Sequence, residues 1–137
     1  MVHGMQPYNI TGALLCPMLD ARRMEVYCLL ADAQGHLLLP THPRVMEDHS
    51  FEEWLTKHAI IFFGNGVAKC KLLLSHTRRA WCVEACYPTA QHVGTLASLK
   101  FQQAAFEEIA SFEPTYLKPF QGKPPKVQAS IPLLRRS

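Results

Sequence analysis

Residues 60–71 read Ile60-Ile61-Phe62-Phe63-Gly64-Asn65-Gly66-Val67-Ala68-Lys69-Cys70-Lys71. Four consecutive large apolar residues predict a strand that is buried on both faces, as strands inside a parallel sheet are. The Gly-Asn-Gly triplet at 64–66 is expected to be a structural turn, because Gly and Asn tolerate positive φ angles. Apolar residues then recur at helical spacing over 67–74, with Lys71 as the one polar member of the set. A buried strand, a tight turn and a helix predict a layered α/β domain with other strands on both sides of residues 60–63.

Three further strands are predicted before this unit, over residues 13–19, 24–30 and 36–39. The polar turn at 20–23 lies between the first two, so we expect an antiparallel hairpin there. Pro17 removes one backbone donor, and we therefore expect the first strand to lie at a sheet edge or to carry a bulge. Pro40 and Pro43 are expected to end the third strand.

Two more helices and one more strand complete the pattern. Ser50 and Glu53 match a capping box, which predicts a short helix from residue 51 onward. Residues 81–83 are predicted as a strand. The last helix opens at residues 88–89, and Gly94 within it predicts close approach to a neighbour. An apolar stripe runs along that helix through Ala90, Val93, Ala97 and Phe101.

The predicted order is three strands, helix, strand, helix, strand, helix. A meander followed by such a βαβα run is the pattern of one ribonuclease-H-like lobe of the actin-like ATPase superfamily, βββαβαβα, with a mixed sheet and helices on its faces. We divide the 137 residues into a lead-in over 1–12, this lobe over 13–118 and a Pro-rich, basic tail over 119–137 that we expect to be disordered.

The composition fits a soluble globular protein, with 48% hydrophobic and 18% charged residues. The net charge of +3 is weak, and four of the positive charges fall in the last fifteen residues, so composition alone makes no case for a nucleic-acid surface. The cysteines number five, without a Cys-x-x-Cys pair or a signal-peptide pattern, which predicts reduced thiols in a cytoplasmic protein. No apolar run is long enough for a membrane helix, so we expect no membrane contact.

Two places invite a functional interpretation. Arg22 and Arg23 can be a solvated turn, or they can contact RNA phosphate or a partner's carboxylate. Residues 64–66 can hold an anion at the start of the following helix, but tight-turn geometry is the better explanation, because they lack the Lys-Ser/Thr of a phosphate-binding loop.

The remaining residues show no recognisable pattern for a metal site or a nucleophilic active site. Cys82, Cys86 and His92 have the atoms for a metal site, but their spacing is uneven, and a free Cys is commonly a small buried hydrophobe. No Ser, Cys or Asp stands in a recognisable nucleophile setting. We therefore expect no catalytic residue, no metal and no cofactor in this chain.

Three stretches together resemble one family: Leu19-Asp20-Ala21-Arg22-Arg23-Met24-Glu25-Val26-Tyr27, Phe62-Phe63-Gly64-Asn65-Gly66-Val67-Ala68-Lys69-Cys70, and Phe112-Glu113-Pro114-Thr115-Tyr116-Leu117-Lys118. In order and separation they look like the C-terminal half of TsaB (YeaZ-type, glycoprotease-like) proteins, in the form found in Bacteroides-group bacteria. The resemblance covers about residues 13–118.

This resemblance implies a role in tRNA modification. TsaB proteins are the partner subunits of the glycoprotease-like TsaD, and the TsaB–TsaD–TsaE system transfers threonylcarbamoyl onto the adenosine next to the anticodon (t6A). The resemblance therefore implies a non-catalytic scaffold subunit that supports a TsaD-like subunit and a TsaE-like ATPase and meets tRNA through the complex.

The resemblance covers one lobe of a two-lobed family. A full TsaB has an N-terminal lobe before the hairpin, and its helices make most of the contacts with TsaD and with a second copy. We expect the face that packed against that lobe to be covered by homodimerisation, with at least about 1,000 Å² buried in total. The alternatives are a small glycoprotease-like hydrolase or peptidase, and a truncated lobe with no retained activity.

Overall fold

The computed structural model describes residues 12–84 and 86–119. The elements follow in the order β1 (Leu14–Asp20), β2 (Glu25–Ala31), β3 (Leu37–Val45), α2 (Glu52–Leu55), β4 (Ile60–Phe63), α3 (Val67–Leu74), β5 (Ala80–Val83) and α4 (Ala90–Gln102). The predicted order of strands and helices is therefore confirmed. The predicted lead-in and tail lie outside the described residues, apart from Gly12 and Pro119.

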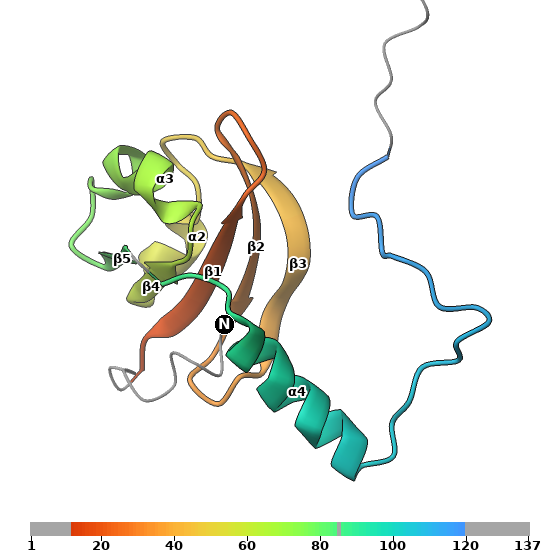
Figure 1. Ribbon diagram of the computed structural model, residues 1–137. Helices are drawn as coiled ribbons and strands as arrows, with labels where there is room; N and C mark the ends of the chain where they lie inside the picture. Colours follow the sequence, from red (N-terminus) through yellow and green to blue (C-terminus); the bar gives the residue numbers. More distant parts are fainter. Residues whose placement is uncertain (1–11, 85, 120–137) are drawn as a thin grey trace, which may run out of the picture.

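The five strands form one mixed sheet in the order β3-β2-β1-β4-β5 (Figure 1). β1 pairs antiparallel with β2, and β2 pairs antiparallel with β3. β4 pairs parallel with β1 on one side and with β5 on the other. This arrangement is the single ribonuclease-H-like lobe that the pattern of strands and helices predicts.

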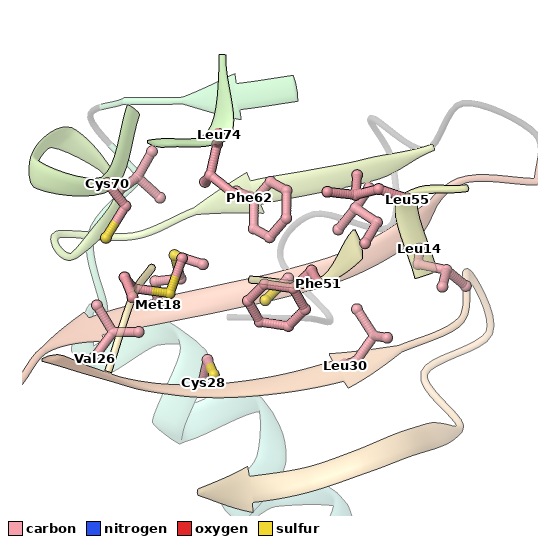
Figure 2. Close-up of a cluster of buried hydrophobic side chains, with 14 residues drawn as sticks. Leu14, Met18, Val26, Cys28, Leu30, Phe51, Leu55, Phe62, Cys70 and Leu74 are labelled. Atoms are coloured by element: carbon pink, nitrogen blue, oxygen red, sulfur yellow. The ribbon is translucent and has the colours of Figure 1, made fainter. Parts of the chain in front are cut away.

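The main core lies between one face of the sheet and helices α2 and α3 (Figure 2). Alternate residues of β1 and β2 point into it, because successive side chains of a strand face opposite sides. Phe51 and Phe62 meet edge to face at its centre, with ring centroids 5.3 Å apart, and both are almost fully buried. The other members of this cluster are Leu14, Cys16, Met18, Val26, Cys28, Leu30, Met46, Leu55, Ile60, Val67, Cys70 and Leu74.

The opposite face of the sheet carries a smaller buried cluster of Ala13, Leu15, Ile61 and Phe63. β4 therefore contributes to both clusters, and each of its four residues is buried. This confirms the prediction that residues 60–63 form a strand buried on both faces.

The position of β1 corrects one prediction. Pro17 does not place this strand at an edge, because β1 is the middle strand of the sheet. Leu15 bridges to Ala31 and Met18 to Cys28 in one unbroken register, while no bridge to β2 forms at the two residues between them. The missing donor of Pro17 is thus accommodated by a local gap in the ladder, without a bulge or an edge position.

The third strand also differs from its prediction. β3 continues through Pro40 and Pro43 to Val45 and is nine residues long. β3 is an edge strand, where a residue without an N–H donor is tolerated because one side of the strand has no neighbour to bond. The register between β2 and β3 shifts near Leu30, so the irregularity expected in β1 lies in this pair instead.

The predicted capping box at Ser50 and Glu53 is wrong. Phe51 precedes α2 in the left-handed region (φ 65°), and no side chain caps that helix. The Ser50 hydroxyl accepts a hydrogen bond from the backbone N–H of Glu47 at 2.9 Å instead. Burying a Phe side chain stabilises by about 1.5–3 kcal/mol, against about 1 kcal/mol for a cap, so packing of Phe51 decides the local backbone.

Helix α4 does not pack as the apolar stripe predicts. None of its thirteen residues is buried, and it extends beyond the rest of the lobe (Figure 1). Apart from the neighbouring backbone of α4 itself, a Cβ atom at Gly94 would meet no described atom within 4 Å, so the close approach predicted there is wrong. Within the described residues, no helix is long and apolar enough to cross a membrane.

Candidate contact site at the hairpin corner

The turn after β1 and the turn after β4 lie side by side. β1 and β4 run parallel, so their carboxyl ends reach the same edge of the sheet. The backbone N–H of Asp20 donates to Oδ1 of Asn65 at 3.1 Å, and the N–H of Gly66 donates to the Met18 carbonyl at 3.0 Å. The two places singled out from the sequence, Arg22-Arg23 and residues 64–66, therefore meet at one corner, which we call the hairpin corner and define as residues 20–25, 64–66, Lys69 and Lys118.

The two glycines of the 64–66 turn are required for different physical reasons. Gly64 has φ 114°, a conformation that side-chain-bearing residues rarely adopt. Gly66 has an ordinary φ, but a Cβ there would lie 3.0 Å from Val26 Cγ1 and 3.1 Å from the Leu19 carbonyl carbon. The turn is therefore set by local conformation at one glycine and by close backbone contact at the other, which supports its structural interpretation.

Arg22 and Arg23 occupy a turn that has strained backbone angles and is held by hydrogen bonds. Their φ angles are 70° and 48°, both in the left-handed region, which costs roughly 1–2 kcal/mol per non-glycine residue. The Asp20 carboxylate accepts the Arg22 N–H at 2.8 Å, and the Glu25 N–H donates to the Arg22 carbonyl at 3.1 Å. Both side chains are exposed, and neither guanidinium forms an ion pair with any residue that the structure describes. Strain of this kind is found more often at functional sites than elsewhere.

Two lysines neutralise the carboxylates of the corner. Lys69, in the first turn of α3, donates to the Asp20 carboxylate and, at 2.6 Å, to the Glu25 carbonyl. Lys118 donates to the Glu25 carboxylate at 2.6 Å, across a separation of 93 residues. With both carboxylates paired, the unpaired charges that the corner presents are the two guanidinium groups.

The charges of the corner are stable at neutral pH. The hydrogen bond from Lys69 lowers the pKa of the Asp20 carboxyl below its ordinary value, and the Arg22 N–H adds to this effect. Asp20 is therefore ionised at neutral pH. The corner can recognise an anionic group through Arg22 and Arg23, and it contains no thiol, hydroxyl or imidazole for covalent chemistry.

Sequence reasoning included Asp20 in the polar turn at 20–23, but it missed Glu25, Lys69 and Lys118 as parts of this corner. A signal for Lys69 exists, since a cation in the first turn of a helix opposes the helix dipole unless a carboxylate lies nearby. No comparable signal marks Lys118, because its partner depends on the path of the chain after α4.

The metal ligands considered from the sequence do not gather. His92 Nδ1 accepts the backbone N–H of Thr89 at 3.2 Å and so belongs to the start of α4. Burial raises the pKa of the Cys82 and Cys86 thiols, which fits small half-buried hydrophobes. Within residues 12–84 and 86–119, no three His, Cys, Asp or Glu side chains are placed to hold a metal ion.

Comparison with known proteins identifies the fold. No family model and no curated protein matches the chain. Among solved structures, an uncharacterized protein from Pseudomonas aeruginosa with similarity to peptidase YeaZ is similar, with a TM-score of 0.62 and 16% identity. The match covers 85% of this chain and 55% of that one, so the chain spans about half the length of its structural neighbour. The lobe therefore has a YeaZ-like fold.

Proposed function

We propose that this chain is a non-catalytic scaffold subunit of the TsaB type, which supports a TsaD-like catalytic subunit in forming threonylcarbamoyladenosine on tRNA. The YeaZ-like fold is consistent with this role. The observation that carries the proposal is where the three family-like stretches lie. The hairpin stretch 19–27 bonds to the stretch 62–70 through Asp20 and Asn65, and to the stretch 112–118 through Glu25 and Lys118. Stretches far apart in sequence thus build one corner.

The chemistry of this corner favours recognition of a partner. Its carboxylates are held by lysines, and its two exposed arginines can pair with a partner's carboxylate or, within the assembled complex, with tRNA phosphate. We propose Arg22 and Arg23 as these contacts, with a TsaD-like subunit as the direct partner and a TsaE-like ATPase as a further member. The five free thiols fit a reducing compartment, and we propose the cytoplasm.

The rival function is a small glycoprotease-like hydrolase or peptidase. A thiol and an imidazole do lie near each other, with Cys28 Sγ 3.9 Å from His42 Nε2. The His42 Nδ1 donates to the Pro40 carbonyl at 2.8 Å, which makes Nε2 the acceptor nitrogen. The Arg44 Nε–H donates to this Nε2 at 3.3 Å, so the nitrogen that would activate a thiol already accepts a hydrogen bond. Cys28 is 2% exposed and points into the main core (Figure 2), so a peptide substrate has no access to its sulfur.

The test is reconstitution of the modification reaction with TsaD-like and TsaE-like proteins from the same genome. We expect this chain to co-elute with the TsaD-like protein at fixed stoichiometry and to support t6A formation, measured by nucleoside mass spectrometry. The double variant Arg22→Glu, Arg23→Glu should lose both, because it reverses the exposed charge of the corner. Arg78→Glu is the matched control, since Arg78 is exposed and lies outside the corner.

Two results would contradict the proposal. A folded chain that never co-elutes with the TsaD-like protein would favour the third possibility, a lobe with no retained activity. Peptide hydrolysis by the isolated chain, lost on Cys28→Ser, would favour the hydrolase. Co-elution that survives the Arg22 and Arg23 reversals would keep the scaffold role and remove the hairpin corner as its contact.

A further inference from the structure

A cavity lined mostly by apolar residues lies between helix α4 and the sheet face opposite the main core. Its volume is about 470 Å³. Residues of three strands and of α4 line it, among them Pro17, Leu19, Tyr27, Leu29, Leu37 and Leu96. Leu37 is 60% exposed and Leu96 is 43% exposed, so the cavity is open to solvent. Apolar surface is unfavourable in water, and a cavity of this size and lining is expected to have an occupant.

The segment that follows α4 is attached to two walls of this cavity. Residues 103–118, which we call the strap, turn back at the end of α4 and run along one side of the lobe (Figure 1). At one end, Phe106 packs edge to face on Phe101 of α4, with ring centroids 5.7 Å apart. At the other end, the Lys118 ammonium donates to the carboxylate of Glu25, the first residue of β2, at 2.6 Å. Because α4 and β2 both line the cavity, the strap joins one wall to the other.

The middle of the strap carries a preformed pair of apolar side chains. The Glu108 carbonyl accepts the backbone N–H of Ser111 at 3.1 Å and that of Phe112 at 2.9 Å, which closes one turn. Residues three positions apart in a helical turn lie on the same side, so Ile109 and Phe112 form one apolar pair. Ile109 is 93% exposed and Phe112 is 69% exposed. We call these two side chains the apolar knob.

We propose that the strap is a lid that closes over the cavity and places the apolar knob inside it. Closure removes the apolar surface of the knob and of the cavity from water in one step. The knob is tethered on both sides, and a short flexible tether gives an effective concentration in the millimolar range. A free apolar molecule has to overcome this local concentration, which favours the chain's own segment as the occupant.

On the side of α4, the knob can reach the cavity while the strap stays attached. Leu96, which lines the cavity, lies five residues before Phe101, or about 7.5 Å along the helix axis. The three residues from Phe106 to Ile109 span up to about 10 Å when extended. The contact between Phe101 and Phe106 can therefore remain in place during closure.

The side of β2 gives the same result. Tyr27, which lines the cavity, lies two residues after Glu25, or about 7 Å along the strand. The six residues from Phe112 to Lys118 span up to about 20 Å when extended. The ion pair between Lys118 and Glu25 can therefore also remain, and closure needs only backbone rotation in the two linkers beside the knob.

The test is solution NMR of the full chain with labelled isoleucine and leucine methyl groups. We expect nuclear Overhauser contacts between the Ile109 methyl groups and those of Leu29 and Leu37. Phe112→Ala should shift the Leu29 and Leu37 methyl resonances, because it removes the ring current of an aromatic side chain from the cavity. Tyr116→Ala is the matched control and should leave these resonances unchanged, since Tyr116 lies on the strap outside the knob and is 84% exposed.

Four results would overturn the inference. The first is a folded chain in which the Ile109 methyl groups make no contact with the cavity. The second is an equal shift of the cavity resonances in Phe112→Ala and Tyr116→Ala. The third is contacts that appear only between differently labelled copies in a mixed sample, which would assign the cavity to a second copy. The fourth is a co-purified apolar molecule in contact with Leu29.

The inference goes beyond the proposed function, because strap closure requires no partner. It is measured on the chain alone, whereas the scaffold role is measured by co-elution with the TsaD-like protein and depends on Arg22 and Arg23. A failure of one is therefore distinguishable from a failure of the other.

Discussion

The backbone N–H of Asp20 donates to the side-chain oxygen of Asn65, 45 residues away, across 3.1 Å. This bond joins the end of the first strand to the turn that follows the fourth. Together with the bond from the Gly66 N–H to the Met18 carbonyl and those from Lys69, it holds the Arg22-Arg23 hairpin against the start of α3.

Asn65→Ala should loosen the hairpin. A side-chain hydrogen bond of this type contributes about 0.5–1.5 kcal/mol, and we expect the free energy of unfolding to fall by about that amount in urea titrations. Asn65→Asp keeps an acceptor oxygen in place and should lose less. Equal losses in the two variants would show that the amide oxygen is not the stabilising group.

Gly66→Ala should destabilise the fold by about 1–3 kcal/mol, as overpacking does elsewhere. The added methyl group would press on Val26 Cγ1 at 3.0 Å and on backbone carbons of β1, which cannot rotate away. Gly94→Ala is the opposite control. Apart from the neighbouring backbone of α4, no described atom lies within 4 Å of the added Cβ, and a helical Gly is replaced by the best helix former. It should stabilise the chain by about 0.4–1 kcal/mol. If both substitutions changed the stability in the same direction, the steric explanation would be contradicted.

Asp20 should make stability dependent on pH in the acid range. Lys69 lowers the folded-state pKa of Asp20, so the ionised carboxylate stabilises the fold above its unfolded pKa, near 3.8, and this contribution is lost as the pH falls through the folded value. Asp20→Asn should therefore be less stable than the unmodified chain at about pH 6, and the difference should shrink as the pH falls through the folded-state pKa of Asp20. The effect is modest because the ion pair is partly exposed, with 48% of the Asp20 side chain accessible.

The carboxyl ¹³C titration of Asp20 measures the same pKa directly, and Lys69→Met should move it upward. Asp48→Asn serves as the comparison for the pH series, since Asp48 is exposed and lies outside the hairpin corner. If Asp48→Asn reproduced the whole pH effect, general charge and not the Lys69 pair would be responsible.

Phe62→Ala should cost about 3–5 kcal/mol, because it opens a cavity beneath Phe51 at the centre of the main core. Leu72→Ala removes an 86% exposed side chain and should change stability by no more than about 0.5 kcal/mol. Chemical denaturation of both variants under one set of conditions tests this difference. A small loss at Phe62 would mean that the core can collapse around the missing ring.

Several predictions depended on local sequence patterns. Whether each was confirmed depended on whether contacts with other parts of the chain overrode the local preference. The unbroken apolar run at 60–63 predicted a doubly buried strand, and β4 confirms it. Pro17, Pro40 and Pro43 were interpreted as signals of an edge or an end, but a strand tolerates a proline wherever its N–H is not needed by a neighbour. Ser50 matched a capping pattern, yet burial of the adjacent Phe51 set the backbone instead.

The hairpin corner was only partly predictable. Arg22, Arg23 and residues 64–66 were selected from the sequence, although as two separate features. Lys69 and Lys118 were not selected, because their partners lie 49 and 93 residues away along the chain. Pairs of this kind follow from which strand ends lie together, and no local preference encodes that.

The sequence by itself determined the order of strands and helices, the strand buried on both faces and the turn at 64–66, because hydrophobic periodicity and glycine conformation act over a few neighbouring residues. Only the tertiary structure decided that β1 lies in the middle of the sheet, that Asp20, Asn65 and Lys69 meet, and that α4 stays exposed. These features depend on strand pairing across long separations and on whether an apolar face finds a partner. The free energy of such contacts belongs to the assembled lobe and is not contained in any one segment.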